Sequence, residues 1–331
     1  MCNPILVIIR YDLPSDHIME YVLFGWRNVE LEVPDNWFLA ADGGSEKKGY
    51  FRLDDSLQPR LELVWEYVPF EKALAPSILL EKHKETLEKH IKKAKKKGLK
   101  IPEVKTVMKR EIKVSGHSAL LWVNRMEESL NNAVVWYCEK SERAFVLNLF
   151  FRLDEEETSR RILNRVTKSI KCHFPQDYKV LWSLYVAPIR LPLSFNLVSI
   201  KLTVGLSYIV YKDADEYLYL IIGYSGLIKQ ILSKYKKGLV EWFSKGVKKN
   251  TIDKIERFRR IKFEKRNNEV TLYKKNFSLI RSKANVLYGK IWLDEKLNRI
   301  FAVSVITKIK KFEEARELVE DVSAQLTSVS T

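Results

Sequence analysis

The side chains best suited to nucleophilic or metal chemistry in this sequence are its thiols and imidazoles. Thiolate and imidazole form a common nucleophile–base pair and are the usual ligands of zinc. These residues are Cys2, Cys138, Cys172, His17, His83, His90, His117 and His173. Three cysteines are too few for a disulfide framework or a cysteine-rich zinc module. The spacing of these few residues must therefore decide what they can do.

Cys172 and His173 are neighbours in the chain, which suggests a nucleophile and its base. A catalytic pair must meet within hydrogen-bonding distance, whereas adjacent residues at a helix end point in different directions. Cys172 also follows a predicted helix, and the dipole at a helix C-terminus disfavours a thiolate. We therefore expect no catalytic residue at this pair.

The spacing of the histidines does not indicate a metal site. His83 and His90 are seven residues apart on one predicted helix, whereas a metal-binding pair on a helix prefers a separation of one turn. We expect both to be packed, half-exposed side chains. His117 heads a predicted strand that runs to Trp122, where a structural role is favoured. The sequence thus predicts no metal ligand.

Nucleotide-binding motifs are missing from the sequence. It contains no phosphate-binding loop and no dinucleotide-binding glycine motif after a strand, so we expect no cofactor. The glycines and lysines of residues 41–48 could in principle present N–H groups and charge to an anion. Gly and Asp are also the usual residues of turns, and a hairpin connection is predicted here instead.

Positive charge is concentrated in one part of the chain. The whole sequence carries 58 Lys and Arg against 42 Asp and Glu, yet residues 1–100 are neutral. Residues 226–291, called the basic stretch below, hold 14 Lys and 5 Arg against five acids. Such a stretch can attract a polyanion by counterion release. The predicted anion-binding residues are Lys245, Lys248, Lys249, Arg257, Arg259, Arg260, Lys262, Lys265 and Arg266.

Aromatic residues lie among these cations and allow two interpretations. They could stack on exposed bases of a nucleic acid, or they could be core residues beneath a solvated lysine surface. The aromatic residues are Trp242, Phe243, Phe258, Phe263, Tyr273 and Phe277. A strand is considered over 257–263, but its residues do not alternate cleanly between apolar and polar, so the sequence leaves both interpretations open.

The chain that must position these residues repeats itself at an offset of 156. Residues 136–163 and 292–319 share seven identities in 28 gap-free positions, among them Trp136 and Trp292. Each copy combines a polar hairpin turn, a strand and a helix with one apolar face. A match in element order supports a duplication, because repeats share supersecondary units.

Elements upstream of each hairpin also correspond. Paired strands are predicted over 49–53 with 61–67, and over 207–212 with 217–223. Each pair leads into a lysine-rich helix with one apolar face, over about 77–97 in the first copy and 226–249 in the second. The predicted apolar faces are Leu80, Leu87, Ile91 and Ala94 in the first helix, and Ile228, Ile231, Leu232, Tyr235, Leu239 and Trp242 in the second. Gly98 follows the first helix and is a good C-cap residue. Each unit is therefore predicted to run ββ-α-βββ-α, an antiparallel sheet with its helices segregated to one side.

Several stretches carry a resemblance to a known fold. They are Pro34-Asp35-Asn36-Trp37, Gly49-Tyr50-Phe51-Arg52-Leu53-Asp54, Leu61-Glu62-Leu63-Val64-Trp65-Glu66 and Lys171-Cys172-His173. With the unit order, they resemble the PsbP-like α+β fold, which is shared by a photosystem extrinsic subunit and a Ran-binding nuclear protein. More specifically, the chain is similar to a prokaryotic family, expected to be archaeal and thermophilic, with two such units in tandem. The resemblance implies no reaction, cofactor or site residue.

The predicted fold class is α+β, a tandem duplication of an antiparallel-sheet-plus-helices unit. We expect an N-terminal extension over 1–30, a first unit over 31–190 and a second over 191–331, with Pro188 and Pro192 at the junction. A content of 46% apolar and 30% charged residues excludes a disordered chain. No stretch approaches the length of a membrane helix. A cytoplasmic protein with no membrane partner is expected.

These observations favour a non-enzymatic binding or adaptor protein whose basic C-terminal half engages an acidic partner, either nucleic acid or an acidic protein. One alternative is a protein-interaction scaffold that uses the sheet faces or the groove between the units. Another is an enzyme with a site in the inter-domain cleft, around His117 or His173.

Overall fold

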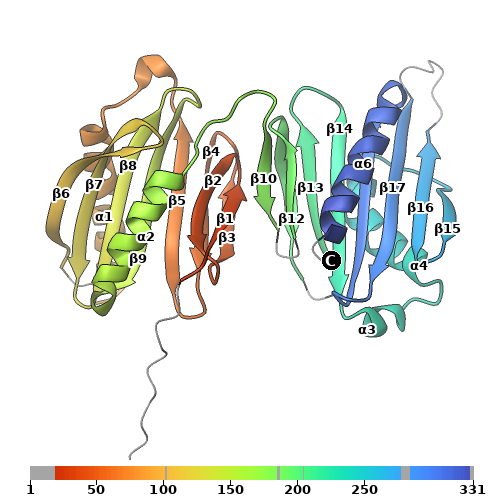
Figure 1. The fold of residues 1–331 in the computed structure, drawn as a ribbon, viewed down its shortest axis with the longest axis horizontal. Coiled ribbons are helices and arrows are strands. Elements are labelled where there is room, and N and C mark those ends of the chain that lie inside the picture. Colours follow the sequence, from red (N-terminus) through yellow and green to blue (C-terminus); the bar gives the residue numbers. More distant parts are fainter. Residues whose placement is uncertain (1–18, 101–102, 185–186, 204, 277–283, 329–331) are drawn as a thin grey trace, which may run out of the picture.

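Two antiparallel sheets of seven strands each dominate the computed structural model, which describes residues 19–100, 103–184, 187–203, 205–276 and 284–328 (Figure 1). The first sheet has the order β3-β4-β5-β9-β8-β7-β6, and the second has the order β12-β13-β14-β18-β17-β16-β15. The two orders correspond strand for strand. The α+β class and the tandem duplication are therefore confirmed.

The first unit places three strands before its long helix and four strands after it. Its strands are β3 (Phe38–Gly44), β4 (Lys48–Asp54), β5 (Pro59–Tyr67), β6 (Lys105–Val114), β7 (His117–Met126), β8 (Ser129–Cys138) and β9 (Arg143–Arg152). Its helices are η1 (Phe70–Lys72), α1 (Pro76–Lys96), η2 (Leu153–Glu155) and α2 (Glu156–Ser169). Each predicted strand pair is present, with more strands in the unit than the order ββ-α-βββ-α contains.

The second unit repeats this arrangement. Its strands are β12 (Phe195–Lys201), β13 (Ser207–Asp213), β14 (Leu218–Gly226), β15 (Lys262–Arg266), β16 (Glu269–Lys275), β17 (Asn285–Asp294) and β18 (Arg299–Lys308). Its helical elements are α3 (Ile228–Leu232), α4 (Leu239–Phe243), η3 (Ser244–Lys248), α5 (Ile252–Ile255), η5 (Ile309–Lys311) and α6 (Phe312–Thr327).

A short hairpin precedes each sheet. In the first unit it consists of β1 (Tyr21–Trp26) and β2 (Val29–Pro34), and in the second of β10 (Lys179–Ser183) and β11 (Pro188–Pro192). The predicted boundaries of the units fall inside these hairpins, because residue 31 lies in β2 and residue 190 lies in β11. Because the hairpins are part of the repeat, we propose that the units begin near residues 20 and 179.

Alternation along the strands divides each sheet into two apolar faces. On β9, Phe145 and Leu147 face the core shared with α2, whereas Val146 faces the side covered by α1. The equivalent residues of β18 alternate between the α6 side and the side covered by α3, α4 and α5. Helices therefore cover both faces of each sheet (Figure 1), and the expectation that they lie on one side is wrong because both faces are apolar.

The residues that reveal the repeat occupy equivalent positions in the two cores. Trp136 stacks on Phe145 with 4.8 Å between ring centroids, and Trp292 stacks on Phe301 at 5.3 Å. Both pairs lie across the two strands that come last along the chain in their unit, β8 with β9 and β17 with β18. Side-chain packing on this strand pair thus explains why the repeat is clearest there.

The two units meet through their hairpins, which lie in the middle of the molecule (Figure 1). The rings of Trp26 and Trp182 are 5.3 Å apart in an edge-to-face contact. Gly25 lies so close to Leu181 that a Cβ on the glycine would be 2.4 Å from the Leu181 carbonyl oxygen. Glycine is therefore required at this close approach of two backbones.

The lysine-rich helix of the first unit is confirmed as α1, and Gly98 follows it with a φ of 81°. Of its predicted apolar face, only Leu80 is buried. Within the described part of the chain, no helix combines the length and apolar character that crossing a membrane requires.

The single helix predicted over 226–249 is wrong. The structure has α3, α4, a π-helical turn (η3) and α5 in its place. Leu227 and Gly238 both have positive φ, at 60° and 58°, which interrupts a right-handed helix. The apolar stripe still packs on the sheet, because Ile231 and Trp242 are buried there.

A buried ion triad fixes the turn between β4 and β5 to the start of α2. The Arg60 guanidinium donates to Asp55 at 2.5 Å and to both Glu155 oxygens at 2.8 and 2.9 Å. Burial raises the pKa of both carboxyls, but Arg60 and backbone N–H donors outweigh it, so each pKa is lowered.

We expect the triad to make the protein less stable in acid. Carboxyls with a lowered pKa stabilise the fold above their unfolded pKa of about 4, and that stability is lost as the pH falls through the lowered values. Denaturant unfolding between pH 7 and pH 2 should show this loss. Replacement of Arg60 with methionine should flatten the acid slope, and an unchanged slope would contradict the assignment.

Candidate functional site

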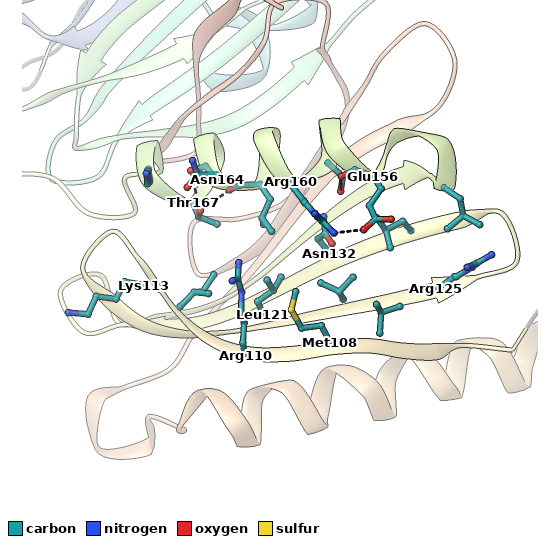
Figure 2. Close-up of a pocket in the computed structure, with 18 residues that line it drawn as sticks. Met108, Arg110, Lys113, Leu121, Arg125, Asn132, Glu156, Arg160, Asn164 and Thr167 are labelled. Carbon is teal, nitrogen blue, oxygen red and sulfur yellow. Dashed lines mark hydrogen bonds and ion pairs between the residues drawn. The ribbon is translucent and has the colours of Figure 1, made fainter.

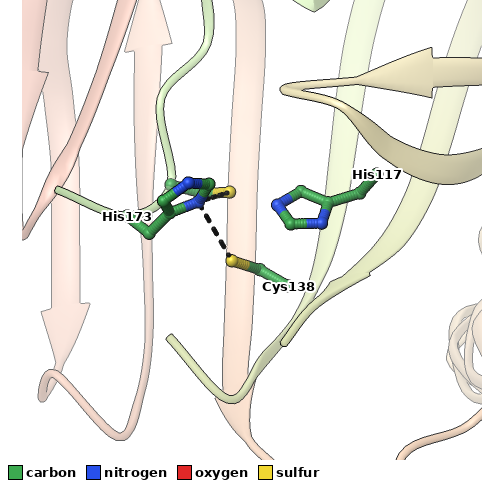
Figure 3. Close-up of side chains that lie close together, drawn as sticks. His117, Cys138 and His173 are labelled. Atoms are coloured by element: carbon green, nitrogen blue, oxygen red, sulfur yellow. Dashed lines mark hydrogen bonds between the residues drawn. The ribbon is translucent and has the colours of Figure 1, made fainter. Parts of the chain in front are cut away.

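Four potential metal ligands gather where β7 begins and β8 ends in the first sheet, and this group is called here the thiol–imidazole cluster. Its members are His117, Cys138, Cys172 and His173, and their ligand atoms all lie within 4.8 Å of one another. The Nδ1 atom of His173 is 3.4 Å from the Cys138 sulfur and 3.7 Å from the Cys172 sulfur. Figure 3 shows the His117 ring pointing toward Cys138 and His173.

Three separate elements bring the cluster together. His117 begins β7, directly after a two-residue turn in which Ser115 and Gly116 have positive φ. Cys138 ends β8, the next strand of the sheet. Cys172 and His173 follow α2, where the chain pairs with the hairpin through an isolated bridge between Lys171 and Glu30.

Arg143 holds the segment that carries the second cysteine. Its guanidinium donates to the carbonyl oxygen of Cys172 at 3.0 Å, to that of Asn28 at 2.9 Å and to that of Arg27 at 3.3 Å. The side chain is buried and lies over the Phe145 ring. One cation thus joins β9, the β1–β2 hairpin and the segment after α2.

The two cluster thiols differ in acidity. The hydrogen bond with the Cys172 thiol, together with Ser141 and the charge of His117, lowers the pKa of Cys138 to about 4 against the effect of burial. The same pairing, together with burial, raises the pKa of Cys172. The pairing of the two thiols therefore lowers the pKa of Cys138 and raises the pKa of Cys172.

The expectation that Cys172 and His173 point in different directions is wrong. Helix α2 ends at Ser169, so these two residues lie beyond the helix, and the imidazole of His173 turns back toward both sulfurs. Spacing along the chain relates histidines and cysteines only within local segments. It therefore did not combine His117 and Cys138 with this pair.

The remaining predicted residues of this type do not join the cluster. His83 is half-buried beside Trp122, with 6.4 Å between ring centroids, and burial lowers its pKa. His90 is exposed. Cys2 and His17 lie outside the described residues.

A pocket of about 280 Å³ reaches the cluster from the surface. Cys172 and His173 contribute to its wall together with Arg143, and Lys47 and Lys140 contribute cationic side chains. The pocket gives a small ion or molecule a route to the sulfur and imidazole groups.

A groove of about 770 Å³ lies between α2 and strands β6 and β7 and is called here the α2–β6 groove (Figure 2). Its floor is largely aliphatic, with Leu121, Val123, Leu130 and Leu163 buried there beside the smaller polar side chains of Asn132, Ser159 and Thr167. Met108 is 39% exposed, and the neighbouring Val107 is 60% exposed, so the β6 side of the groove also offers apolar surface.

Cations line the rim of this groove. They are Arg110, Lys113, Arg125, Arg160 and Lys168. In Figure 2, Lys113 and Arg125 lie toward opposite ends of the groove, and Arg110 points across it. The one acidic lining residue, Glu156, pairs with Arg160 at 2.6 Å. The groove therefore has a net positive rim around an aliphatic floor.

The nine predicted anion-binding residues lie along η3, the loop after α5 and the edge strand β15. All are exposed except Lys248, which is half-buried and pairs with Asp253 at 2.6 Å. Lys245 pairs with Glu241, also at 2.6 Å. On β15, Lys265 lies on one face of the sheet and Arg266 on the other, because side chains alternate along a strand.

The predicted strand over 257–263 is wrong, because the strand begins at Lys262 and runs to Arg266. Three of the aromatic side chains that could have stacked on bases are buried in the core beneath the sheet, namely Trp242, Phe243 and Phe258. Phe263 and Tyr273 are half-buried, and Phe277 lies outside the described residues. The core interpretation of these aromatic residues therefore holds for the three buried rings.

Comparisons with known proteins found similar structures. Cyanobacterial PsbP (CyanoP) from Synechocystis sp. PCC 6803 is 12% identical with a TM-score of 0.37, covering 49% of this chain and 97% of CyanoP. The Tle4–Tli4 complex includes a chain 10% identical with a TM-score of 0.28, covering 92% of this chain and 96% of that one. The immunity protein TplEi of T6SS from Pseudomonas aeruginosa is 10% identical with a TM-score of 0.27, covering 91% of this chain and 96% of TplEi. No protein-family model and no curated protein matches the sequence.

Proposed function

We propose that the chain is a binding protein whose α2–β6 groove receives an acidic, partly apolar segment of a protein partner. The observation that supports this proposal is the combination of an aliphatic floor with a cationic rim in one groove. Apolar side chains of the partner would bury against Leu121 and Val123. Its carboxylates would then meet Arg110, Lys113 and Lys168, so that charge sets the orientation and the rate of association.

The aliphatic floor favours a protein segment over a nucleic acid. Single-stranded nucleic acids bind through cations joined to aromatic rings on which bases stack. None of the residues lining the groove is aromatic. A leucine and valine floor instead suits the aliphatic anchors of a peptide, which gain binding energy by leaving water.

The basic stretch is a second candidate surface for an acidic partner. Lys249, Arg257, Arg259, Arg260 and Lys262 are all exposed there. Trp242, Phe243 and Phe258 beside these cations are buried in the core, so we propose this surface as a purely electrostatic contact. Its partner would be nucleic acid or an acidic protein.

A binding titration distinguishes the two surfaces. The probe is a fluorescent peptide of about a dozen residues that alternates Glu with Leu, with a single-stranded oligonucleotide as comparison. Reversal of two groove charges (Arg110→Glu with Lys113→Glu) should weaken peptide binding at least about tenfold, or about 1.4 kcal/mol, and should reduce the dependence of affinity on salt.

The matched control reverses two charges on the edge strand of the second unit (Lys265→Glu with Arg266→Glu) and should leave peptide binding unchanged. Loss of binding in the control but not in the groove variant would transfer the function to the basic stretch. Tighter binding of the oligonucleotide than of the peptide would replace the protein partner with a nucleic acid.

A further inference from the structure

The geometry of the thiol–imidazole cluster points to a second site, independent of the groove: we propose that His117, Cys138, Cys172 and His173 bind one zinc ion in a closed, tetrahedral, structural site. Two sulfurs and two imidazoles are a donor set that zinc prefers, whereas calcium and magnesium prefer oxygen ligands. No carboxylate belongs to the cluster.

The separations between donor atoms match a zinc tetrahedron. Zinc–sulfur bonds of about 2.3 Å and zinc–nitrogen bonds of about 2.1 Å place sulfur and nitrogen about 3.6 Å apart at a tetrahedral angle. The two distances from His173 Nδ1 to the sulfurs, 3.4 and 3.7 Å, lie on either side of this value. One metal ion could therefore contact all three atoms with little movement of the chain.

The imidazole of His117 supplies an independent observation. Its Nε2 atom is buried and has no hydrogen-bond partner within the described chain. A buried polar atom without a partner costs free energy, and such atoms call for an explanation such as an ion. Its ring centroid lies 5.4 Å from that of His173, in an edge-to-face arrangement. A metal ion between the rings would give this nitrogen its missing contact.

The second unit provides an internal comparison. Strand pairing places Asp294 where the first unit has Cys138, and Asn267 where it has His117. The repeat offset places Ser328 at the position of Cys172. The second unit folds with the same strand order and without this donor set. The cluster is therefore not a packing requirement of the fold, and its presence in one unit needs a separate reason.

Zinc in this position would join parts of the first unit that are distant in sequence. It would hold the segment after α2, which leads into the second unit, against the start of β7 and the end of β8. Arg143 acts as a positioning residue because it holds the Cys172 carbonyl oxygen rather than contacting the metal. With four protein ligands, the site leaves no position for a substrate, which is the arrangement of structural zinc sites.

Metal analysis of the reduced, full-length chain tests the proposal. After incubation with equimolar zinc and buffer exchange, elemental analysis should find one zinc ion per chain. Cobalt substitution should produce the visible absorption of tetrahedral cobalt and a sulfur-to-metal charge-transfer band. Chelator should lower the melting temperature of the wild type, because a ligand that binds only the folded state stabilises it.

Variants separate metal ligation from folding. Cys138→Ser and His117→Gln should each lower zinc affinity by more than about 100-fold, and chelator should no longer shift their melting temperatures. Arg143→Lys should lower affinity by about 10–100-fold, the usual effect of residues that orient ligands. Cys2→Ser and His90→Gln are the matched controls and should bind as the wild type does. His117 lies at a strand start and is only half-buried, so its variant should fold.

Three results would overturn the proposal. The first is a reduced wild-type chain that takes up no stoichiometric zinc. The second is undiminished zinc binding by both Cys138→Ser and His117→Gln. The third is a disulfide between Cys138 and Cys172 that forms at the same rate with and without bound zinc, since metal-bound thiolates should be protected from oxidation.

Discussion

Replacement of Glu30 with alanine is expected to lower the free energy of unfolding by about 2–4 kcal/mol. The Glu30 carboxylate is completely buried between the two hairpins. It accepts hydrogen bonds from the Leu181 backbone N–H at 2.8 Å and from the Tyr178 hydroxyl at 2.9 Å. Removal leaves the buried Leu181 N–H without a partner, which costs more than the net value of the bond.

Arg190 contributes little to this expected loss. Its guanidinium is 3.3 Å from Glu30, but its side chain is 39% exposed, so water screens the ion pair and can replace it. Glu30→Gln keeps an acceptor for Leu181 and should lose less than half as much stability as Glu30→Ala. Chemical denaturation followed by circular dichroism measures both values.

The matched control is an acid in an exposed ion pair. Glu66 pairs with Lys48 at 3.1 Å, with side chains 58% and 73% exposed. Glu66→Ala should therefore change stability by less than about 1 kcal/mol. An equal loss in Glu30→Ala and Glu66→Ala would show that burial between the hairpins is unimportant.

The repeat was predictable because it depends on local pattern. Alternating apolar residues and a polar turn define the last strand pair of each unit, and the helix after it has one apolar face. Trp136 and Trp292 mark the same core position and so remain identical in the two copies. The β1–β2 and β10–β11 hairpins were not predicted, because their strands have only five or six residues and are held by contacts with the other hairpin.

The thiol–imidazole cluster could not be predicted from spacing along the chain. Cys138 and Cys172 are separated in the chain by β9 and α2. Only the folded sheet brings the start of β7, the end of β8 and the segment after α2 together. A stronger signal was available in the repeat itself. At the offset of 156, Cys138 and Cys172 align with Asp294 and Ser328, so both thiols occur in one copy only.

The broken helix of the second unit shows a different limit. Ile231 and Trp242 of its predicted apolar stripe are buried in the core of the second unit. Periodicity does not reveal that Leu227 adopts a positive φ, which few residues other than glycine do. Gly238 and Gly246 were the local signs of an interruption inside the predicted helix.

Replacement of Trp182 with alanine is expected to lower the free energy of unfolding by about 3–5 kcal/mol, the usual cost of removing a buried large aromatic side chain. Trp182 is completely buried. Its ring centroid lies 5.3 Å from that of Trp26 and 4.8 Å from that of Tyr211, and both contacts are edge-to-face. Its indole N–H has no partner within the described chain. The loss is therefore one of packing between the units rather than of a hydrogen bond.

Two comparisons test whether Trp182 couples the two units. Leu57 is 78% exposed, so Leu57→Ala should change stability by less than about 0.5 kcal/mol. A double-mutant cycle of Trp26→Leu and Trp182→Leu should give a coupling energy of about 0.5–1.5 kcal/mol, the range measured for aromatic pairs. Additive losses would mean that each ring packs only within its own unit. A positive coupling would instead show that the two hairpins stabilise each other across the boundary of the duplication.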